Sequence, residues 1–141
     1  MKILVINGPN LGKLPQRDKA LYGFKSIDQI NEELKNKYQN IKFRFIQTNH
    51  EGIIIDELEK FGGDAIVINP GAYTHTSIAI RDALESIKKL KVEVHLSDIY
   101  NREDFRKINY ICDVVDKTII GKQDYGYFLA VEYIIEKLSK K

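Results

Sequence analysis

The sequence is poor in the residues that mark several classes of protein. Its 141 residues include one cysteine, three prolines and no tryptophan. A single cysteine forms no internal disulfide, and Cys112 lies in an apolar stretch, so we expect a buried, inert thiol in a reducing compartment. The apolar stretch 3–6 is too short for a signal segment or a membrane span. The expected location is the cytoplasm, with no membrane partner.

An excess of charge of one sign is also lacking. Lys and Arg number 22 and Asp and Glu number 20, which leaves a net charge of +2, and the two signs are interleaved along the chain. Such a chain has no basic stripe of the kind that neutralises phosphate backbones, so we expect no nucleic-acid partner. The hydrophobic fraction of 43% and the length fit one globular domain spanning residues 1–141.

Short β-rich runs alternate with segments of helical pattern. The first predicted helix begins at Ser26, where Gln29 completes a capping box, and ends near Gln39. The others are about Glu51 to Phe61, Ser77 to Leu90, a short helix after Asn101, and about Tyr125 to Leu138, with residues 109–116 left unassigned. Five runs are predicted to be strands: Lys2 to Asn7, Lys42 to Thr48, Asp64 to Asn69, Val92 to Ser97 and Lys117 to Gly121. This alternation predicts an α/β fold, a flavodoxin-like doubly wound sheet of five parallel strands with helices on both faces. Ligands of such folds bind beyond the carboxyl ends of the strands.

An unusually long segment, at about residues 8–25, separates the first strand from the first helix and is predicted to be a lid. It contains Asn10, Arg17 and Tyr22. A guanidinium close to a phenol favours the phenolate, which is a base. The alternative is that Arg17 and Tyr22 are ordinary exposed loop residues, and spacing alone does not decide between these readings.

Polar side chains also cluster at the ends of the third and fourth strands. Asn69 and His75 are placed to bind a polar ligand, although turn and capping roles would explain them too. Because strand residues alternate between faces, Glu93, His95 and Ser97 share one surface. A carboxylate two residues from an imidazole can orient it as a general acid, and the alternative is a structural histidine.

Two arginines, Arg102 and Arg106, lie one turn apart after the fourth strand, and either could clamp an anionic or hydroxyl-rich ligand. Surface ion pairing explains Arg102 equally well. His50 and Glu51 complete the predicted rim, with His50 more typical of a surface or packing residue. The sequence has no metal-ligand spacing and no glycine-rich nucleotide motif, so we expect neither metal nor cofactor.

Taken together, these segments resemble one family. The chain resembles the type II 3-dehydroquinate dehydratases over nearly its whole length. The resemblance lies in these motifs: NGPNL followed by RDKALYG, QTNHEG, INPGAYTHTSIAIRDAL, and VEVHLSDI followed by REDFR. The resemblance implies a lyase of the shikimate pathway and aromatic amino acid biosynthesis, which needs no cofactor. It also implies a dodecamer built from trimers. This chain departs from the family pattern at Pro15, Asp18 and Lys19 in the lid and at Asp98.

The resemblance also implies residue roles. Tyr22 would take a proton from C2 of 3-dehydroquinate with Arg17 favouring its phenolate, Asn10 would position a water at the enolate, and His95, oriented by Glu93, would protonate the departing C1 hydroxyl. The residues implied to hold the substrate are Asn69, His75, Leu96 through its backbone amide, Ser97 and Arg106, with Asp82 reaching a neighbouring subunit's site.

Two other readings compete with this enzyme. One is a non-enzymatic flavodoxin-like module that binds a small ligand or a partner protein, because the fold hosts many functions. The other is a family member whose altered lid has lost activity. Turnover of 3-dehydroquinate separates the active enzyme from the inactive family member, whereas unchanged ligand binding in Arg17→Ala or Tyr22→Phe would favour the binding module.

Overall fold

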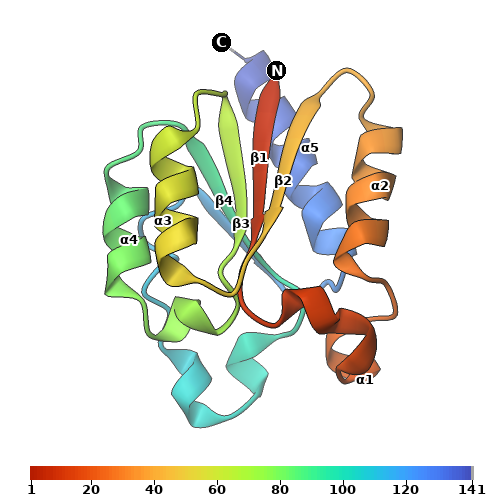
Figure 1. Ribbon diagram of the computed structural model, residues 1–141, viewed down its shortest axis with the longest axis vertical. Helices are drawn as coiled ribbons and strands as arrows, with labels where there is room; N and C mark the ends of the chain where they lie inside the picture. The colour runs from red at the N-terminus through yellow and green to blue at the C-terminus, as the bar shows by residue number, and fades with distance from the viewer. Residues whose placement is uncertain (141) are drawn as a thin grey trace.

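The computed structural model describes residues 1–140 and consists of one parallel sheet between two layers of helices (Figure 1). The strands, in the order β2-β1-β3-β4-β5, are β1 (Lys2–Asn7), β2 (Lys42–Gln47), β3 (Ala65–Asn69), β4 (Leu90–His95) and β5 (Lys117–Ile120). The helices are α1 (Lys19–Tyr22), α2 (Ile27–Lys37), α3 (Glu51–Lys60), α4 (Ile78–Glu85) and α5 (Tyr125–Ser139). The predicted five-stranded, flavodoxin-like α/β architecture is confirmed.

The sheet is buried on both faces because its central strands are apolar throughout. β3 is buried at every position, and so is β1 after Lys2. Alternate residues serve two cores: Val5 and Val67 pack with α2 and α5, whereas Ile6 and Ile68 pack with α3 and α4. Figure 1 shows the same division of the helices between the two faces.

The start of α2 follows the sequence prediction closely. Gln29 N donates to Ser26 Oγ over 3.1 Å, and Ser26 N donates to Gln29 Oε1 over 2.8 Å. This reciprocal pair is a capping box, which satisfies backbone amides that the first helical turn leaves free.

Three predictions need correction. α4 ends at Glu85 rather than near Leu90, because Leu90 already pairs with Ala65 as the first residue of β4. The helix expected after Asn101 is replaced by two 3₁₀ segments, Ile99–Asn101 and Asp104–Lys107. Cys112 is exposed rather than buried, because the turn that buries its neighbour Ile111 directs Cys112 outward.

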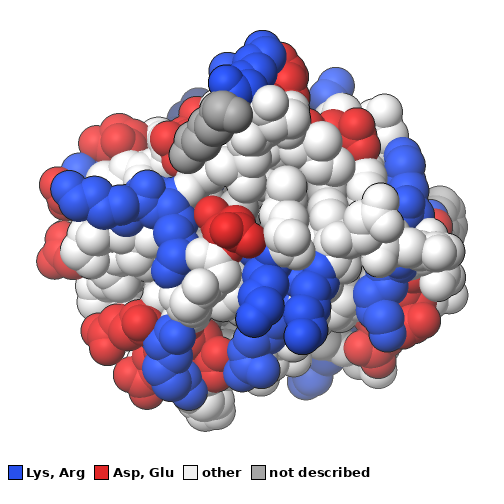
Figure 2. Space-filling model, turned by 90° about the horizontal axis from the view of Figure 1, so that it is seen from above, with Lys and Arg blue, Asp and Glu red and all other residues white. Residues whose placement is uncertain are grey.

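The carboxyl ends of the strands lie at the bottom of Figure 1, where residues 8–25 and the two 3₁₀ segments after β4 meet. The opposite end carries the start of β1 and the end of α5. Figure 2 shows that end, where Lys and Arg are interspersed with Asp and Glu and with uncharged side chains. None of the helices in residues 1–140 has the length and apolar character needed to cross a bilayer.

Candidate active site

A small polar cavity of about 110 Å³ lies beyond the carboxyl ends of β1, β3 and β4. This is the edge where the strand order reverses direction in a doubly wound sheet. Segments far apart in the chain supply its walls, which are Pro9, Asn10, Arg17, Tyr22, Asn69, Gly71, Ala72, His75, His95, Leu96, Ser97, Ile99, Arg102 and Arg106. All but two of the residues to which the family resemblance gives a role line it, and the exceptions are Glu93 and Asp82, described below. Arg102, which the sequence left open between ligand binding and surface ion pairing, lines it as well.

Tyr22 is the last residue of α1, and its side chain is buried against the cavity. Its hydroxyl oxygen accepts hydrogen bonds from Arg17 Nη2 at 2.5 Å and from Arg102 Nη1 at 2.8 Å. The Arg17 guanidinium also lies over the phenol ring, with its central carbon 3.9 Å from the ring centroid. Two cationic donors on one oxygen stabilise an anion there more than a neutral hydroxyl.

Arg102 is the residue that sequence reasoning left undecided. Its Nη1 also donates to Ser97 Oγ at 3.2 Å, and its Nε lies 3.7 Å from Glu103 Oε1. Its side chain is therefore part of the cavity wall as well as of a surface ion pair. Its spacing from Arg106 gave a hint, but only the fold brings it to Tyr22, which is 80 residues away in the chain.

Glu93 and His95 project from the same face of β4, as the alternation predicted. His95 Nε2 lies 2.5 Å from Glu93 Oε2, and both side chains are buried. Because the Glu93 carboxylate accepts a hydrogen bond from His95 Nε2, this ring nitrogen carries a proton, and Nδ1 is the nitrogen left for a ligand. His95 lines the cavity, whereas Glu93 lies behind it.

The Glu93 carboxyl is surrounded by hydrogen-bond donors. Thr118 Oγ1 lies 3.0 Å from Oε1, Thr74 Oγ1 lies 2.7 Å from Oε2, and Asn109 Nδ2 reaches Oε2 at 3.0 Å. Burial by itself raises the pKa of Glu93, but the bonds from His95, Thr74 and Asn109 outweigh burial and hold the pKa below its ordinary value. Glu93 is therefore an ionised carboxylate that stabilises positive charge on His95.

The turn after β3 supplies a second wall. Asn69 Oδ1 accepts from the backbone amide of Gly71 at 3.0 Å, which fixes the turn at Pro70. Gly71 has φ of 61°, a left-handed conformation in which a side chain would be strained, and its missing Cβ would lie 3.1 Å from the Pro9 carbonyl oxygen. Ser77 caps α4 by accepting from Ile80 N at 2.9 Å, which agrees with the predicted start of this helix.

His75 and Arg106 form the rim near the segment after β4. His75 Nδ1 donates to the Ile108 carbonyl oxygen over 2.7 Å, which leaves Nε2 for the cavity. Burial lowers the pKa of His75, and the charges of His95 and Arg106 act in the same direction, against the bond to Ile108. Arg106 Nε donates to Glu103 Oε1 at 2.8 Å, which aligns its side chain along the rim.

Three other predicted residues lie away from the cavity walls. Asp82 is exposed on α4, and His50 is exposed at the start of α3, where it precedes Glu51. None of the three is among the residues that line the cavity. His50 and Glu51 therefore do not form a rim of this cavity, and the exposed His50 agrees with the alternative of a surface residue.

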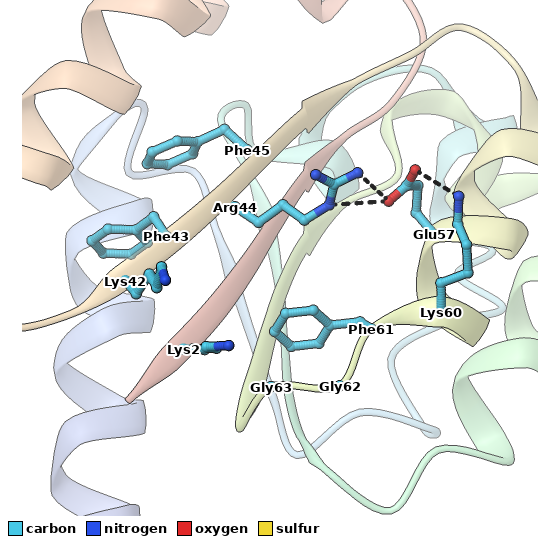
Figure 3. Close-up of a pocket in the computed structure, with 10 residues that line it drawn as sticks. All are labelled: Lys2, Lys42, Phe43, Arg44, Phe45, Glu57, Lys60, Phe61, Gly62 and Gly63. Carbon is cyan, nitrogen blue, oxygen red and sulfur yellow. Dashed lines mark hydrogen bonds and ion pairs between the residues drawn. The ribbon is translucent and has the colours of Figure 1, made fainter.

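A larger groove, of about 690 Å³, lies at the other end of the molecule beside the edge strand β2 (Figure 3). Three of its charged groups are paired with one another: Arg44 Nη2 lies 3.0 Å from Glu57 Oε2, and Lys60 Nζ lies 3.4 Å from Glu57 Oε1. Charged side chains on an edge strand commonly discourage pairing with another sheet. We therefore place the site in the smaller cavity.

Known proteins match the chain over almost its full length. The family described as dehydroquinase class II matches residues 1–135. A 3-dehydroquinate dehydratase of Thermotoga petrophila is 47% identical over 99% of both chains, and one of Francisella philomiragia is 46% identical over 100% of this chain and 99% of its own. A type II dehydroquinase structure from Butyrivibrio crossotus superposes with a TM-score of 0.91 at 45% identity, covering 95% of this chain and 97% of its own.

The doubly wound sheet, with a polar cavity at its switch point, defines an α/β enzyme whose site is formed by side chains from several strand ends. The matches then make the assignment specific. The chain belongs to the class II dehydroquinase family.

Proposed function

We propose that the protein is a 3-dehydroquinate dehydratase of the shikimate pathway, which converts 3-dehydroquinate to 3-dehydroshikimate through an enolate. Membership of the class II dehydroquinase family supports the reaction. One observation carries the mechanism: the Tyr22 hydroxyl, held by two guanidinium groups, lines the same cavity as the Glu93-oriented His95. A base and an acid in one small cavity suit an elimination.

In the first step the Tyr22 phenolate takes the proton from C2 of the substrate. Arg17 and Arg102 stabilise the phenolate before the transfer, because both donate to its oxygen. The electron pair released at C2 delocalises into the ketone as an enolate. Asn10, which also lines the cavity, positions a water molecule at the enolate oxygen.

In the second step the C1–O bond breaks. The departing oxygen takes a proton from His95 and leaves as water, and the electron pair of the enolate forms the new double bond. Glu93 stabilises the imidazolium that exists before this transfer, since it is ionised and fully buried. Return of the proton from Tyr22 to His95 completes the cycle, so the enzyme gains and loses nothing.

The remaining polar groups hold the substrate. Asn69, Ser97 and the backbone amide of Leu96 bind its carboxylate, and His75 and Arg106 bind ring hydroxyls; all five residues line the cavity. The charge on Arg106 and Arg102 favours an anionic substrate.

We propose that residues 8–25 act as a lid over this cavity. Within this segment Asp18 caps α1 by accepting from Ala20 N at 2.9 Å, and Lys19 Nζ donates to the Pro15 carbonyl oxygen at 3.0 Å. The three lid residues that depart from the family pattern, Pro15, Asp18 and Lys19, thus contact one another or α1 itself. Gln123 Nε2 anchors the lid by donating to the Ala20 carbonyl oxygen over 3.3 Å.

The test is turnover by purified protein and by Tyr22→Phe, followed by the absorbance of the conjugated enone. The wild type should convert 3-dehydroquinate, and Tyr22→Phe should lose about 10³-fold or more in kcat with unchanged unfolding, because only the basic oxygen is removed. A wild type without turnover would overturn the proposal in favour of a binding module or an inactive relative. Full activity of Tyr22→Phe would exclude Tyr22 as the base.

We also propose that the chain assembles into trimers and dodecamers in which Asp82 reaches a neighbouring site. Exposed apolar side chains on the segments near α4 support an interface there, and Ile78, Phe105 and Ile108 are each more than half exposed, at 55%, 65% and 54%. Light scattering on the purified protein should give the mass of a dodecamer. Asp82→Ala should lower kcat/KM without changing that mass, and a monomeric wild type would contradict the assembly.

A further inference from the structure

Behind the cavity wall, a buried hydroxyl joins two asparagines at the ends of neighbouring strands. Asn7 ends β1 and Asn69 ends β3, and the two residues are register partners in the sheet. Tyr127, on α5, lies against both: it accepts from Asn69 Nδ2 at 3.0 Å and donates to Asn7 Oδ1. Asn69 lines the cavity, whereas Asn7 and Tyr127 do not.

The Tyr127 hydroxyl has one proton, and that proton is committed. Tyr127 is fully buried, and burial raises the pKa of its phenol well above the ordinary value, so the hydroxyl remains protonated. Because the proton goes to Asn7 Oδ1, the phenol oxygen can only accept from Asn69. The Asn69 amide must therefore turn its nitrogen, Nδ2, toward the Tyr127 oxygen.

The other side of the same amide carries the opposite demand. The backbone N–H of Gly71 points at Asn69 and requires an acceptor, which Asn69 Oδ1 provides. If the Asn69 amide were flipped, its Nδ2 donor would face the Gly71 N–H donor, and its Oδ1 acceptor would face the Tyr127 oxygen, which also needs a donor. Each mismatch leaves a buried polar group unsatisfied, which costs roughly 1–3 kcal/mol.

One hydrogen of Asn69 Nδ2 then remains. Within residues 1–140 it has no hydrogen-bond partner, and Asn69 borders the cavity. We propose that Tyr127 and Asn7 are positioning residues that fix the amide of Asn69 so that it presents an N–H donor to an anionic oxygen of the ligand. This inference rests on the proposed function for the identity of that ligand, the carboxylate of 3-dehydroquinate.

The first test compares Tyr127→Phe with Tyr38→Phe. Tyr38 is a matched control, because its hydroxyl is also held by a hydrogen bond, donating to Glu132 Oε2 on α5 at 2.6 Å, but Tyr38 does not line the cavity. Tyr127→Phe should raise KM for 3-dehydroquinate about tenfold with kcat changed less, since it weakens binding of a group that does not react. Tyr38→Phe should leave KM and kcat unchanged.

A second variant keeps the phenol and removes only the acceptor for its proton. In Asn7→Leu the Tyr127 hydroxyl is free to donate to Asn69, which permits the flipped amide. We expect KM to rise in the same direction as in Tyr127→Phe. Unchanged KM in both variants, with active wild type, would overturn the inference.

A third measurement is independent of turnover and uses the wild type alone. In ¹H–¹⁵N spectra the two side-chain amide protons of Asn69 should differ, one protected from exchange by Tyr127 and the other exchanging with solvent. Two equally exchanging protons would overturn the inference even in an active enzyme. If the wild type failed to turn over 3-dehydroquinate while one proton stayed protected, the proposed function would fail and the fixed amide would stand.

Discussion

The two ends of the sheet differ in what their side chains do. The groove at the amino ends is about 690 Å³ and the cavity at the carboxyl ends about 110 Å³. In the groove, Arg44 and Lys60 are both paired with one partner, the half-buried Glu57 on the neighbouring helix α3. In the cavity, Arg17 and Arg102 converge on a phenol instead of a carboxylate. The convergence of polar side chains from distant segments, rather than the size of the cavity, identifies the site.

Of the substitutions that test this comparison of the two ends, the largest effect is expected at the buried Glu93–His95 pair beside the smaller cavity. Glu93→Gln should lower kcat about 10²-fold, because the imidazolium of His95 loses its counter-charge. It should also destabilise the fold by about 3 kcal/mol, since an amide nitrogen would face donors such as Thr74. Kinetics and urea unfolding measure the two effects, and a variant with wild-type kcat would remove Glu93 from the mechanism.

Truncation of one arginine at each end sharpens the comparison. Arg102→Ala should lower kcat/KM roughly 10- to 100-fold, because Tyr22 loses one of its two cationic donors. Arg44→Ala, which removes an exposed ion pair at the opposite end, should leave kcat/KM unchanged. Equal losses from the two substitutions would show that the comparison of the two ends is wrong.

Lowering the pH should destabilise the fold by protonating Glu93. Its pKa in the folded protein lies below the ordinary value of 4.5, so its ionised form stabilises the fold above pH 4.5, and this stability is lost as pH falls through the folded pKa. The stability difference between wild type and Glu93→Gln should therefore shrink below pH 4.5. Urea unfolding at a series of pH values checks this, and a constant difference would contradict it.

The smallest effect on stability is expected from the capping box at the start of α2, which involves none of the ion pairs at either end of the sheet. Ser26→Ala removes the acceptor for Gln29 N and should cost about 1 kcal/mol of stability. Turnover should not change, because Ser26 is not among the cavity residues. A loss of activity in a fully folded Ser26→Ala protein would instead link α2 to the lid.

Much of the architecture follows from local pattern. The strand alternation, the capping box at Ser26 and the shared face of Glu93 and His95 depend on neighbours within a few residues, and all three predictions are confirmed. Local hydrophobic pattern was misleading where the chain turns without regular structure. Cys112 was predicted to be buried because its neighbours are apolar, but it is exposed.

The parts of the site that the sequence did not reveal depend on contacts between distant segments. Asn109 and Thr118 hold Glu93, and Tyr127 holds Asn69, across separations of 16, 25 and 58 residues. Nothing in the local spacing of these residues distinguishes them from surface amides or core aromatics. Only the folded packing commits each hydroxyl or amide hydrogen to one partner.

The alternation along β4 has a consequence for how this chain can vary in length. Glu93 and His95 face one layer of helices while Val92 and Val94 face the other, and Lys91 to Glu93 are held in register with β3. A single residue inserted between Glu93 and His95 would turn the imidazole into the apolar layer behind α5 and bring a valine to the ligand. Insertions are therefore tolerable before Leu90, in the turn after α4, but within β4 only changes by two residues keep acid and carboxylate on one side.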